Sequence, residues 1–397
     1  MLYILEEVMN ALEKKFLSKI DQHLPVLVIF LVSVIACLLR YTLRHILTRD
    51  AIAFLLPWFE EISQKGLYTQ ASECDYNLLY QFLIWVMTRF PLEPLHLYKI
   101  LSCIGDYLLA GFAALLVYQL DSKNRLWNSI AVYAAILLNP VCFLNSAAWA
   151  QCDALFTSFA ILGLYFLEKE RYNWSLISLG ISFSFKLQAV FFMPIYLFVY
   201  FTRRKFSIVR FSLIPAAMVA TSIPLLFWGR NILETFYVYL RQSGAYTHMA
   251  LNYPTFWTLV CSMMEPQHYF YLKKAAIMLT VCILAFFMIL WLRKKYAAKG
   301  RNMLIMTFIL IYTCVLFLPS MHERYGYPYE ICAILLAVLI PKTVPLCLGL
   351  LLVSLCTYGT YIFEIPINYT VLAIANIALY VAYYYTLKTE LQESAQS

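Results

Sequence analysis

The chain has 397 residues, of which 62% are hydrophobic and 13% charged, and its mean hydropathy is +0.71. Soluble globular domains carry roughly 25% charged residues, so this composition excludes a soluble fold and indicates a membrane protein. The net charge of +8 lies in short runs such as Arg203-Arg204-Lys205, which are typical of cytoplasmic loops and do not indicate a nucleic-acid partner.

Apolar runs follow one another along the whole chain. The first follows a long mixed-charge lead, Glu13-Lys14-Lys15, without a small-residue cleavage site, so we expect a retained helix and not a signal peptide. A spanning helix needs about 20 apolar residues, and the length therefore allows ten or more crossings in one domain, residues 1–397. The runs are Leu24–Leu47, Ile100–Leu120, Leu126–Leu144, Ala154–Leu167, Trp174–Phe201, Ser207–Trp228, Leu272–Leu292, Met303–Leu318, Tyr327–Ile340, Val344–Phe363 and Ile367–Leu387, with a shorter one at Leu78–Phe90.

The run Trp174–Phe201 has positive charge on both sides, at Lys169/Arg171 and at Arg203–Lys205. Positive loops are cytoplasmic, so this run must cross the membrane an even number of times. We therefore expect it to fold back once, as two short helices. Its only polar interruption is Ser184-Phe185-Lys186-Leu187-Gln188, which predicts a turn on the outer side.

The same count applies to the N-terminal part. Only one crossing fits between an outer loop at Asp50 and the inner charges Lys123/Arg125, and Ile100–Leu120 supplies it. The run Leu78–Phe90 is too short to span, and we expect it to lie in the outer interface. The sequence thus predicts an all-α polytopic membrane protein with about twelve transmembrane helices and both termini inside.

This topology places four polar clusters on the outer side: Asp50–Asp75, Trp149–Asp153, Lys186–Gln188 and Pro319–Tyr329. A carboxylate at a helix–loop junction suits a general base, but both Asp50 and Asp153 could instead be helix N-caps. The two could also meet in one cleft. Asp106, inside an apolar run, is either functional or part of a buried structural hydrogen bond.

Basic residues mark the other two clusters. A lysine within a long apolar run is costly unless it reaches water or an anion, so Lys186 either snorkels at the turn or binds a phosphate. His322, Glu323 and Arg324 are consecutive, and an arginine suits bidentate phosphate binding. Their spacing does not match a metal motif, and we expect neither a metal nor a cofactor. Cys74 and Cys152 could pair as a disulfide, although the spacing of the cysteines shows no disulfide framework.

The order of these motifs resembles bacterial relatives of the GPI mannosyltransferase 2 family, within the GT-C superfamily of integral membrane glycosyltransferases. Typical members show W-G-Q-x-D, K-P-Q and M-H-E-R-Y, and this chain has Trp149-Ala150-Gln151-Cys152-Asp153, Lys186-Leu187-Gln188 and Met321-His322-Glu323-Arg324-Tyr325. Asp50 matches the family's first-loop aspartate. The run Asn252-Tyr253-Pro254-Thr255-Phe256-Trp257 resembles an N-x-x-N-x-W segment. Ala150, Leu187 and Thr255 depart from the usual Gly, Pro and Asn.

The resemblance implies a GT-C fold with interfacial helices in the first outer loop, a catalytic module at about 24–228 and C-terminal helices at about 229–388. It implies an inverting transferase that uses a polyprenyl-phosphate sugar on the extracytoplasmic face of a bacterial plasma membrane, with a glycan or lipid acceptor. Asp50 would be the base, supported by Asp153, which is the other candidate for that role. Arg324 and Lys186 would hold the donor phosphate. The remaining substrate-binding residues would be Gln188, Asn252, Trp257, His322, Glu323 and Tyr325.

Two other functions fit the sequence. One is a transporter or flippase of lipid-linked sugar, but such proteins often contain inverted repeats, and the sequence contains no detectable repeat. The other is a eukaryotic endoplasmic-reticulum mannosyltransferase acting on a GPI precursor, for which Asn368-Tyr369-Thr370 would be a glycosylation sequon.

Overall fold

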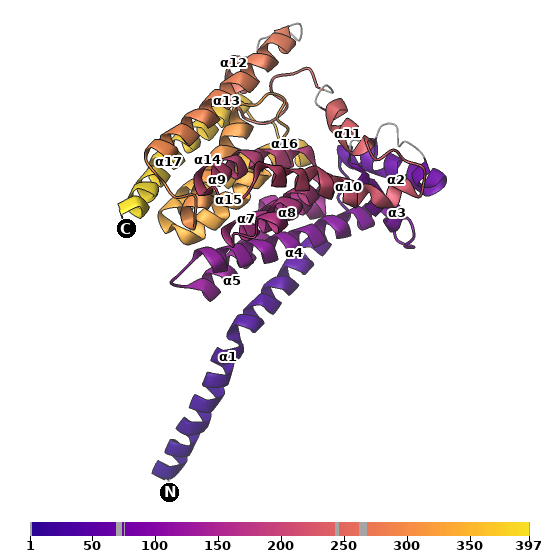
Figure 1. The fold of residues 1–397 in the computed structure, drawn as a ribbon. Coiled ribbons are helices and arrows are strands. Elements are labelled where there is room, and N and C mark those ends of the chain that lie inside the picture. Colours follow the sequence, from indigo (N-terminus) through magenta and orange to yellow (C-terminus); the bar gives the residue numbers. More distant parts are fainter. Residues whose placement is uncertain (1, 69–73, 75, 243–245, 262–267, 397) are drawn as a thin grey trace.

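The computed structural model describes residues 2–68, 74, 76–242, 246–261 and 268–396. Within these ranges the chain is helical, and the one β-type contact is an isolated parallel bridge between Ala250 and Met321. The predicted all-α class is therefore confirmed (Figure 1). The elements are α1 (Leu2–Thr42), η1 (Ala51–Leu55), α2 (Leu56–Lys65), η2 (Gly66–Tyr68), α3 (Leu78–Met87), α4 (Pro94–Leu120), α5 (Arg125–Leu137), α6 (Pro140–Phe143), η3 (Leu144–Ala148), α7 (Asp153–Glu168), α8 (Tyr172–Phe185), η4 (Leu187–Phe192), α9 (Met193–Arg203), η5 (Ile208–Ser212), α10 (Leu213–Leu226), α11 (Glu234–Gln242), α12 (Phe256–Val260), α13 (Tyr269–Arg293), α14 (Arg301–Phe317), α15 (Tyr327–Leu339), η7 (Pro341–Thr343), α16 (Val344–Phe363) and α17 (Tyr369–Gln396).

Six helical segments of the described chain are long and apolar enough to cross a membrane: Glu13–Thr42, Pro94–Leu120, Ile208–Leu226, Tyr269–Arg293, Pro341–Phe363 and Tyr369–Gln392. Shorter apolar helices, including α14 and α15, lie among them. A polytopic membrane protein is therefore confirmed. The total of about twelve crossings requires several of the shorter helices to span as well, and it stays a prediction.

The apolar run Leu126–Leu144 is not one straight helix. It is divided into α5 and the segment Pro140–Ala148, which meet at an angle of 46°. Pro140 has no backbone N–H to donate to the preceding turn, and the Asn139 side chain caps the new helix by accepting a hydrogen bond from the Val141 N–H at 2.8 Å. A seventh span results if the bent pair is counted as one.

The predicted hairpin of Trp174–Phe201 is confirmed. The chain leaves α8 at Lys186, whose backbone is extended, and continues into η4 and α9. The end of α9 lies near the start of α8. Arg203, the last residue of α9, donates from Nη1 to the carbonyl of Leu167, a few residues before α8, at 2.6 Å. The rings of Tyr172 and Phe206 also stack there, with centroids 4.5 Å apart. Lys186 therefore lies at the far tip of the hairpin.

The first loop also follows its prediction in part. The resemblance implied helices in the first outer loop, and this loop contains η1 and α2. Helix α3 has ten residues, which at 1.5 Å per residue is about 15 Å, half of the hydrocarbon thickness. It is therefore too short to span, as predicted.

The pairing suggested for Cys74 and Cys152, which both belong to the described residues, is wrong, because no disulfide joins these two buried thiols.

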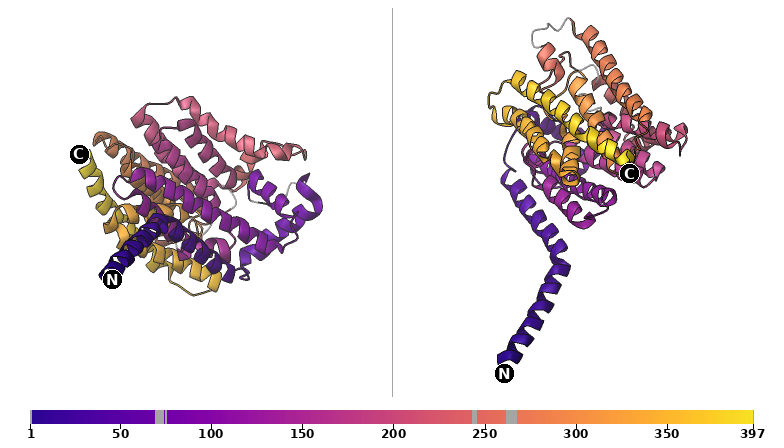
Figure 2. Two further views of the ribbon diagram at one scale, coloured as in Figure 1. Left: turned by 90° about the horizontal axis from the view of Figure 1, so that it is seen from below. Right: turned by 90° about the vertical axis from the view of Figure 1, so that its left-hand side faces the viewer.

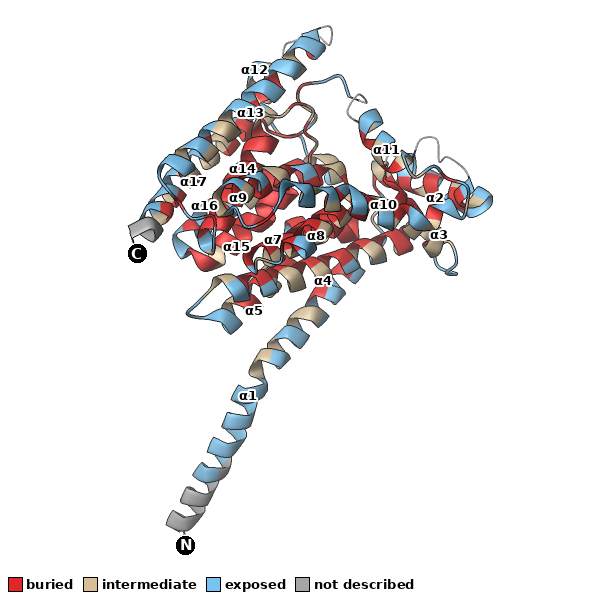
Figure 3. Cartoon of the chain, in the orientation of Figure 1, coloured by how far each residue is buried: buried red, intermediate tan, exposed pale blue. Residues whose placement is uncertain are grey.

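Helix α14 lies at the centre of the helical body, and every residue from Asn302 to Leu316 is buried. Helix α1 is different, because much of its length extends away from the body and is exposed (Figures 2 and 3). Its C-terminal part is held by a buried ion pair, in which Arg40 Nη2 lies 2.8 Å from Asp106 Oδ2. Ser146 also donates to Asp106. Of the two alternatives for Asp106, the buried structural contact is the one observed.

Lys99 fixes the point where the chain leaves α1. This buried residue of α4 donates from Nζ to the carbonyls of Leu43, Arg44 and Ile46, at 3.0, 3.0 and 2.7 Å. These carbonyls follow the last turn of α1, where no further helical N–H is available to bond them. Lys99 thereby sets the path of the segment that ends at Asp50.

Candidate active site

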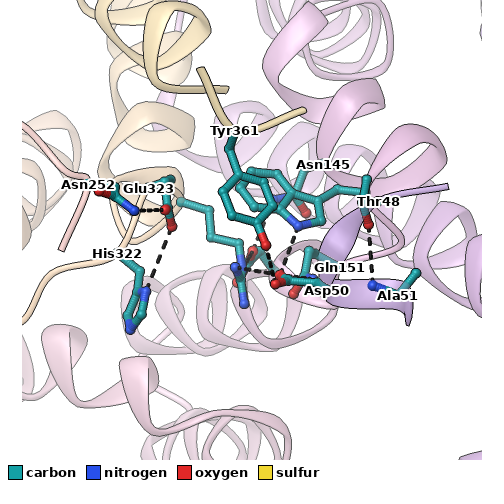
Figure 4. A network of polar contacts seen from close by, with 12 residues as sticks. Thr48, Asp50, Ala51, Asn145, Gln151, Asn252, His322, Glu323 and Tyr361 are labelled. Carbon is teal, nitrogen blue, oxygen red and sulfur yellow. Dashed lines mark hydrogen bonds and ion pairs between the residues drawn. The ribbon is translucent and has the colours of Figure 1, made fainter. Parts of the chain in front are cut away.

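The four polar clusters of the sequence meet at one cavity. Its volume is about 600 Å³, and its lining includes Asp50, Gln151, Lys186, Gln188 and the run His322–Tyr325. Figure 4 shows labelled residues of this network, among them Asp50, Gln151, His322 and Glu323, brought together from segments far apart in the chain.

Asp50 stands at the start of η1 and directs its carboxylate into this network. Its Oδ2 accepts hydrogen bonds from Trp149 Nε1 at 2.9 Å and from Gln151 Nε2 at 3.2 Å. Its Oδ1 accepts one from the hydroxyl of Tyr361. The backbone of Asp50 is helical and its side chain caps no N–H of η1, so the N-cap alternative is wrong. The side chain is 18% exposed.

Asp153 belongs to the first turn of α7, and its side chain is only 2% exposed. One oxygen forms an ion pair with Lys186 Nζ, and the other accepts a hydrogen bond from Asn145 Nδ2 at 2.9 Å. The N-cap position of α7 is occupied by Cys152, so an N-cap role for Asp153 is also wrong. Because Lys186 is buried and paired with this carboxylate, it does not snorkel.

Arg324 lies between the two carboxylates. Its Nη1 is 3.4 Å from Asp50 Oδ2, and its Nε is 3.3 Å from Asp153 Oδ2. The guanidinium carbon is 5.2 Å from the centroid of the Trp149 ring, a cation–π arrangement. Burial lowers the pKa of Arg324, but the negative charges nearby, chiefly that of Asp153, outweigh burial and hold the pKa above its ordinary value. This side chain is therefore a permanent cation in the cavity wall.

The loop that carries Arg324 is anchored to the segment before α12. Glu323 accepts a hydrogen bond from Asn252 Nδ2 at 2.8 Å, and the Ser320 N–H donates to the Met249 carbonyl at 2.9 Å. His322 Nδ1 is 3.7 Å from a carboxylate oxygen of Glu323. These contacts determine where the His322–Tyr325 run faces the cavity.

Two buried polar atoms of cavity-lining residues, Gln188 Oε1 and His322 Nε2, have neither a hydrogen-bond partner nor an ion-pair partner among the described residues. Arg324 Nε also lacks a hydrogen bond there, but it is in ion-pair contact with Asp153. Leaving a buried polar group unpaired typically costs about 1–3 kcal/mol, so groups of this kind gather where a ligand supplies the missing partners. Within the described part of the chain, no group of three or more His, Cys, Asp or Glu side chains could hold a metal ion.

A comparison with known protein families matches residues 76–319 to glycosyltransferase family 87. This segment makes up more than half of the chain and contains Asp153, Lys186 and Gln188. The chain belongs to glycosyltransferase family 87. The match does not show the relationship to the GPI mannosyltransferase 2 family that the motifs suggested. No curated protein matches the chain.

In this family 87 glycosyltransferase, two site residues from the resemblance, Asp153 and Trp257, do not line the cavity. Asp153 lies behind the wall, paired with the lining residues Lys186 and Arg324. Trp257 donates from Nε1 to the Phe317 carbonyl at 2.6 Å and packs in a small hydrophobic cluster with Met249 and Tyr269. It is not part of the cavity lining. Asn252, which the same motif contributes, does line the cavity.

Two aromatic residues complete the site without having been selected from the sequence. Trp149 and Tyr361 both donate to Asp50, and their rings stack with centroids 4.3 Å apart. Trp149 is part of the motif Trp149-Ala150-Gln151-Cys152-Asp153, and its proximity to Asp153 in the sequence was therefore a usable signal. Tyr361 lies in the last turn of α16, within an apolar run that carries no sign of a site.

Proposed function

We propose that this glycosyltransferase moves one monosaccharide from a polyprenyl-phosphate donor to a hydroxyl group of a cell-surface glycan or lipid. The reaction would take place on the extracytoplasmic face of a bacterial plasma membrane and invert the anomeric carbon. The observation that carries the proposal is a single cavity that combines two cationic side chains, Arg324 and Lys186, with the partly exposed carboxylate of Asp50.

The donor phosphate would bind to Arg324 and Lys186. A guanidinium has five N–H donors, more than the contacts of Arg324 with Asp50 and Asp153 require, so donors remain for an anion. Lys186 Nζ pairs with the other carboxylate oxygen of Asp153 and lines the same cavity, so it can turn toward the same phosphate. Protein cations of this kind can stabilise the charge that develops on a leaving phosphate.

The polyprenyl chain requires a way out of the cavity into lipid. Val190 of η4 and Ile277 of α13 belong to the lining and are 40% and 41% exposed. An apolar side chain that lines a cavity and is also exposed on a membrane helix suits a lateral opening toward the acyl chains. The donor would then keep its tail in the bilayer while its phosphate reaches Arg324.

Asp50 is the better candidate for the base. Its side chain is 18% exposed and lines the cavity, whereas that of Asp153 is 2% exposed and held by Lys186 and Asn145. In the reaction, Asp50 accepts the proton of the acceptor hydroxyl as the oxygen of that group attacks the anomeric carbon. The bond from that carbon to the phosphate oxygen breaks, and its electron pair leaves on polyprenyl phosphate. A single displacement of this kind inverts the configuration.

The remaining polar residues would bind the sugar and shape the cavity. Gln188 Oε1 and His322 Nε2 have no hydrogen-bond partner within the described part of the chain and suit sugar hydroxyl groups. Glu323 and Tyr325 line the same wall, where Glu323 also holds Asn252. For Trp257 we propose a supporting role through its bond to the Phe317 carbonyl, next to the loop that carries Arg324.

The test is to incubate the purified protein with a panel of polyprenyl-phosphate sugars and to measure release of polyprenyl phosphate. We expect release with at least one sugar in the presence of an acceptor, and none from the Asp50→Asn variant. If nucleotide sugars are consumed and polyprenyl-phosphate sugars are not, the donor assignment is wrong. Movement of intact lipid-linked sugar across a bilayer without its consumption would favour a transporter.

A further inference from the structure

A second cavity lies at the far end of the helical body. Its volume is about 650 Å³, and it is formed by the end of α9, the loop that follows it and the segment after α13. Helix α13 connects the two cavities, because Tyr269 near its start lines the first and Leu292 near its end lines the second. The 25 residues of α13 span about 37 Å, which corresponds to one bilayer.

The second cavity is strongly basic. Its lining includes five cations and one carboxylate, namely Arg203, Arg204, Lys205, Lys295, Lys299 and Glu170. Lys205 is paired with Glu170, and Arg203 with Glu168. Among the described residues, Arg204, Lys295 and Lys299 form no ion pair within 4 Å and are exposed. Three like charges around one cavity repel each other, and an anion would relieve this repulsion.

The backbone supports the same interpretation. Arg204 and Lys295 have φ values of +50° and +55°, in the left-handed region that favours glycine. Both stand just after a helix, where glycine is the common residue. The chain therefore has long cationic side chains at two positions where the backbone favours no side chain.

The walls of this cavity are apolar toward the membrane. Phe201 of α9 and Leu292 of α13 belong to the lining and are 57% and 45% exposed. A free inorganic anion would gain nothing from these side chains. A phospholipid would, because its acyl chains could lie along α9 and α13 while its phosphate meets the three cations.

We propose that this cavity binds the phosphate headgroup of an anionic phospholipid from the leaflet opposite the active site. Positively charged loops are cytoplasmic, so the lipid would come from the cytoplasmic leaflet, where basic pockets between membrane helices bind such headgroups. The site is separate from the glycosyltransferase cavity, and the proposal does not depend on the donor or the acceptor.

The test uses the full-length protein in phosphatidylcholine nanodiscs, with and without phosphatidylglycerol, and measures the thermal unfolding midpoint. The site variant is Arg204→Gln/Lys295→Gln/Lys299→Gln. The matched control, Lys123→Gln/Arg125→Gln/Lys388→Gln, removes the same charge from residues outside this cavity. We expect phosphatidylglycerol to raise the midpoint of the wild type and the control, and the site variant to lose most of that shift. Each basic residue near an anionic surface adds about 5-fold in affinity, so three should add on the order of 100-fold.

Two further measurements separate the competing explanations. Inorganic phosphate added to phosphatidylcholine nanodiscs should leave the midpoint unchanged, and an equal shift would mean a free-anion site. In phosphatidylcholine alone, the site variant should unfold at or above the wild-type midpoint, because charge repulsion is relieved. If the triple site variant does not fold, the single Lys295→Gln variant is used in its place, and native mass spectrometry measures how much phosphatidylglycerol it retains. Equal lipid effects in the site variant and the wild type, or equal losses in both triple variants, would refute the proposal.

Discussion

Replacement of Asp153 by asparagine should destabilise the protein. The carboxylate is 2% exposed and is the partner of Lys186 and, at 3.3 Å, of Arg324. The amide has nearly the same shape but no charge, so Lys186 is left as a buried cation without its carboxylate. Breaking a buried pair by removing one partner typically costs about 3–5 kcal/mol. Arg324 keeps Asp50 as a partner at 3.4 Å, which places the expected loss near the lower limit, about 3 kcal/mol.

The assay is reversible denaturant unfolding of the purified protein in detergent, with Asp50→Asn as the matched control. Asp50→Asn removes one charge from the same arginine but leaves Lys186 paired with Asp153. Its side-chain oxygen can still accept from Trp149 Nε1, so we expect a loss of about 1 kcal/mol, the scale of one hydrogen bond. Equal losses for the two variants, or no loss for Asp153→Asn, would refute the division between a structural Asp153 and a reactive Asp50.

The other predictions concern the donor, the Arg324 loop and the topology. Arg324→Ala should reduce transfer about 10²–10³-fold, as loss of one charge-stabilising donor does, and abolish donor-induced thermal stabilisation. Arg324→Lys should recover only part of the transfer and of the stabilisation, because an ammonium lacks the planar fork of the guanidinium. Undiminished stabilisation of Arg324→Ala by the donor would argue against a phosphate contact. Gly326→Ala should cost about 1–3 kcal/mol in unfolding experiments, because the added methyl group would meet the Tyr253 hydroxyl and the Glu330 carboxyl, and a wild-type stability would contradict this packing. Cysteines introduced at Tyr68 and Lys123 should react with an impermeant maleimide from opposite sides of the membrane, and labelling from one side would show that the crossing count is wrong.

Much of the architecture could be predicted from charge and hydropathy. The positive residues on both sides of Trp174–Phe201 were sufficient to predict a hairpin with Lys186 at its tip, because parity needs no knowledge of side-chain packing. The length of the apolar run Leu78–Phe90 and the same parity argument were sufficient to predict that α3 is too short to span. The bend at Asn139 and Pro140 was missed, although a proline in an apolar run is the usual cause of such a break.

From the residues alone, the site was predicted as separate clusters whose carboxylates Asp50 and Asp153 could meet in one cleft. Only the family resemblance joined the clusters into one site. That Asp50, Asp153, Lys186 and Arg324 lie together follows from contacts across up to 274 positions of the chain, and no local pattern encodes such a distance. Whether Asp50 caps a helix or joins the polar network of the cavity depends on the direction of its side chain, which local propensity does not determine. Tyr361, which donates to Asp50 from 311 positions away, had no sequence signal, and Trp257 had a motif but no place in the cavity.

Donor binding and sugar transfer, both measured on the Asp50→Asn variant, separate the role of Asp50 from that of the two cations. We expect a polyprenyl-phosphate sugar to stabilise this variant against heat as it does the wild type, since Arg324 and Lys186 are unchanged. Transfer should fall about 10²–10⁴-fold, the typical effect of losing a general base. Near wild-type turnover would contradict the assignment of Asp50 as the base and would leave Asp153 as the next candidate.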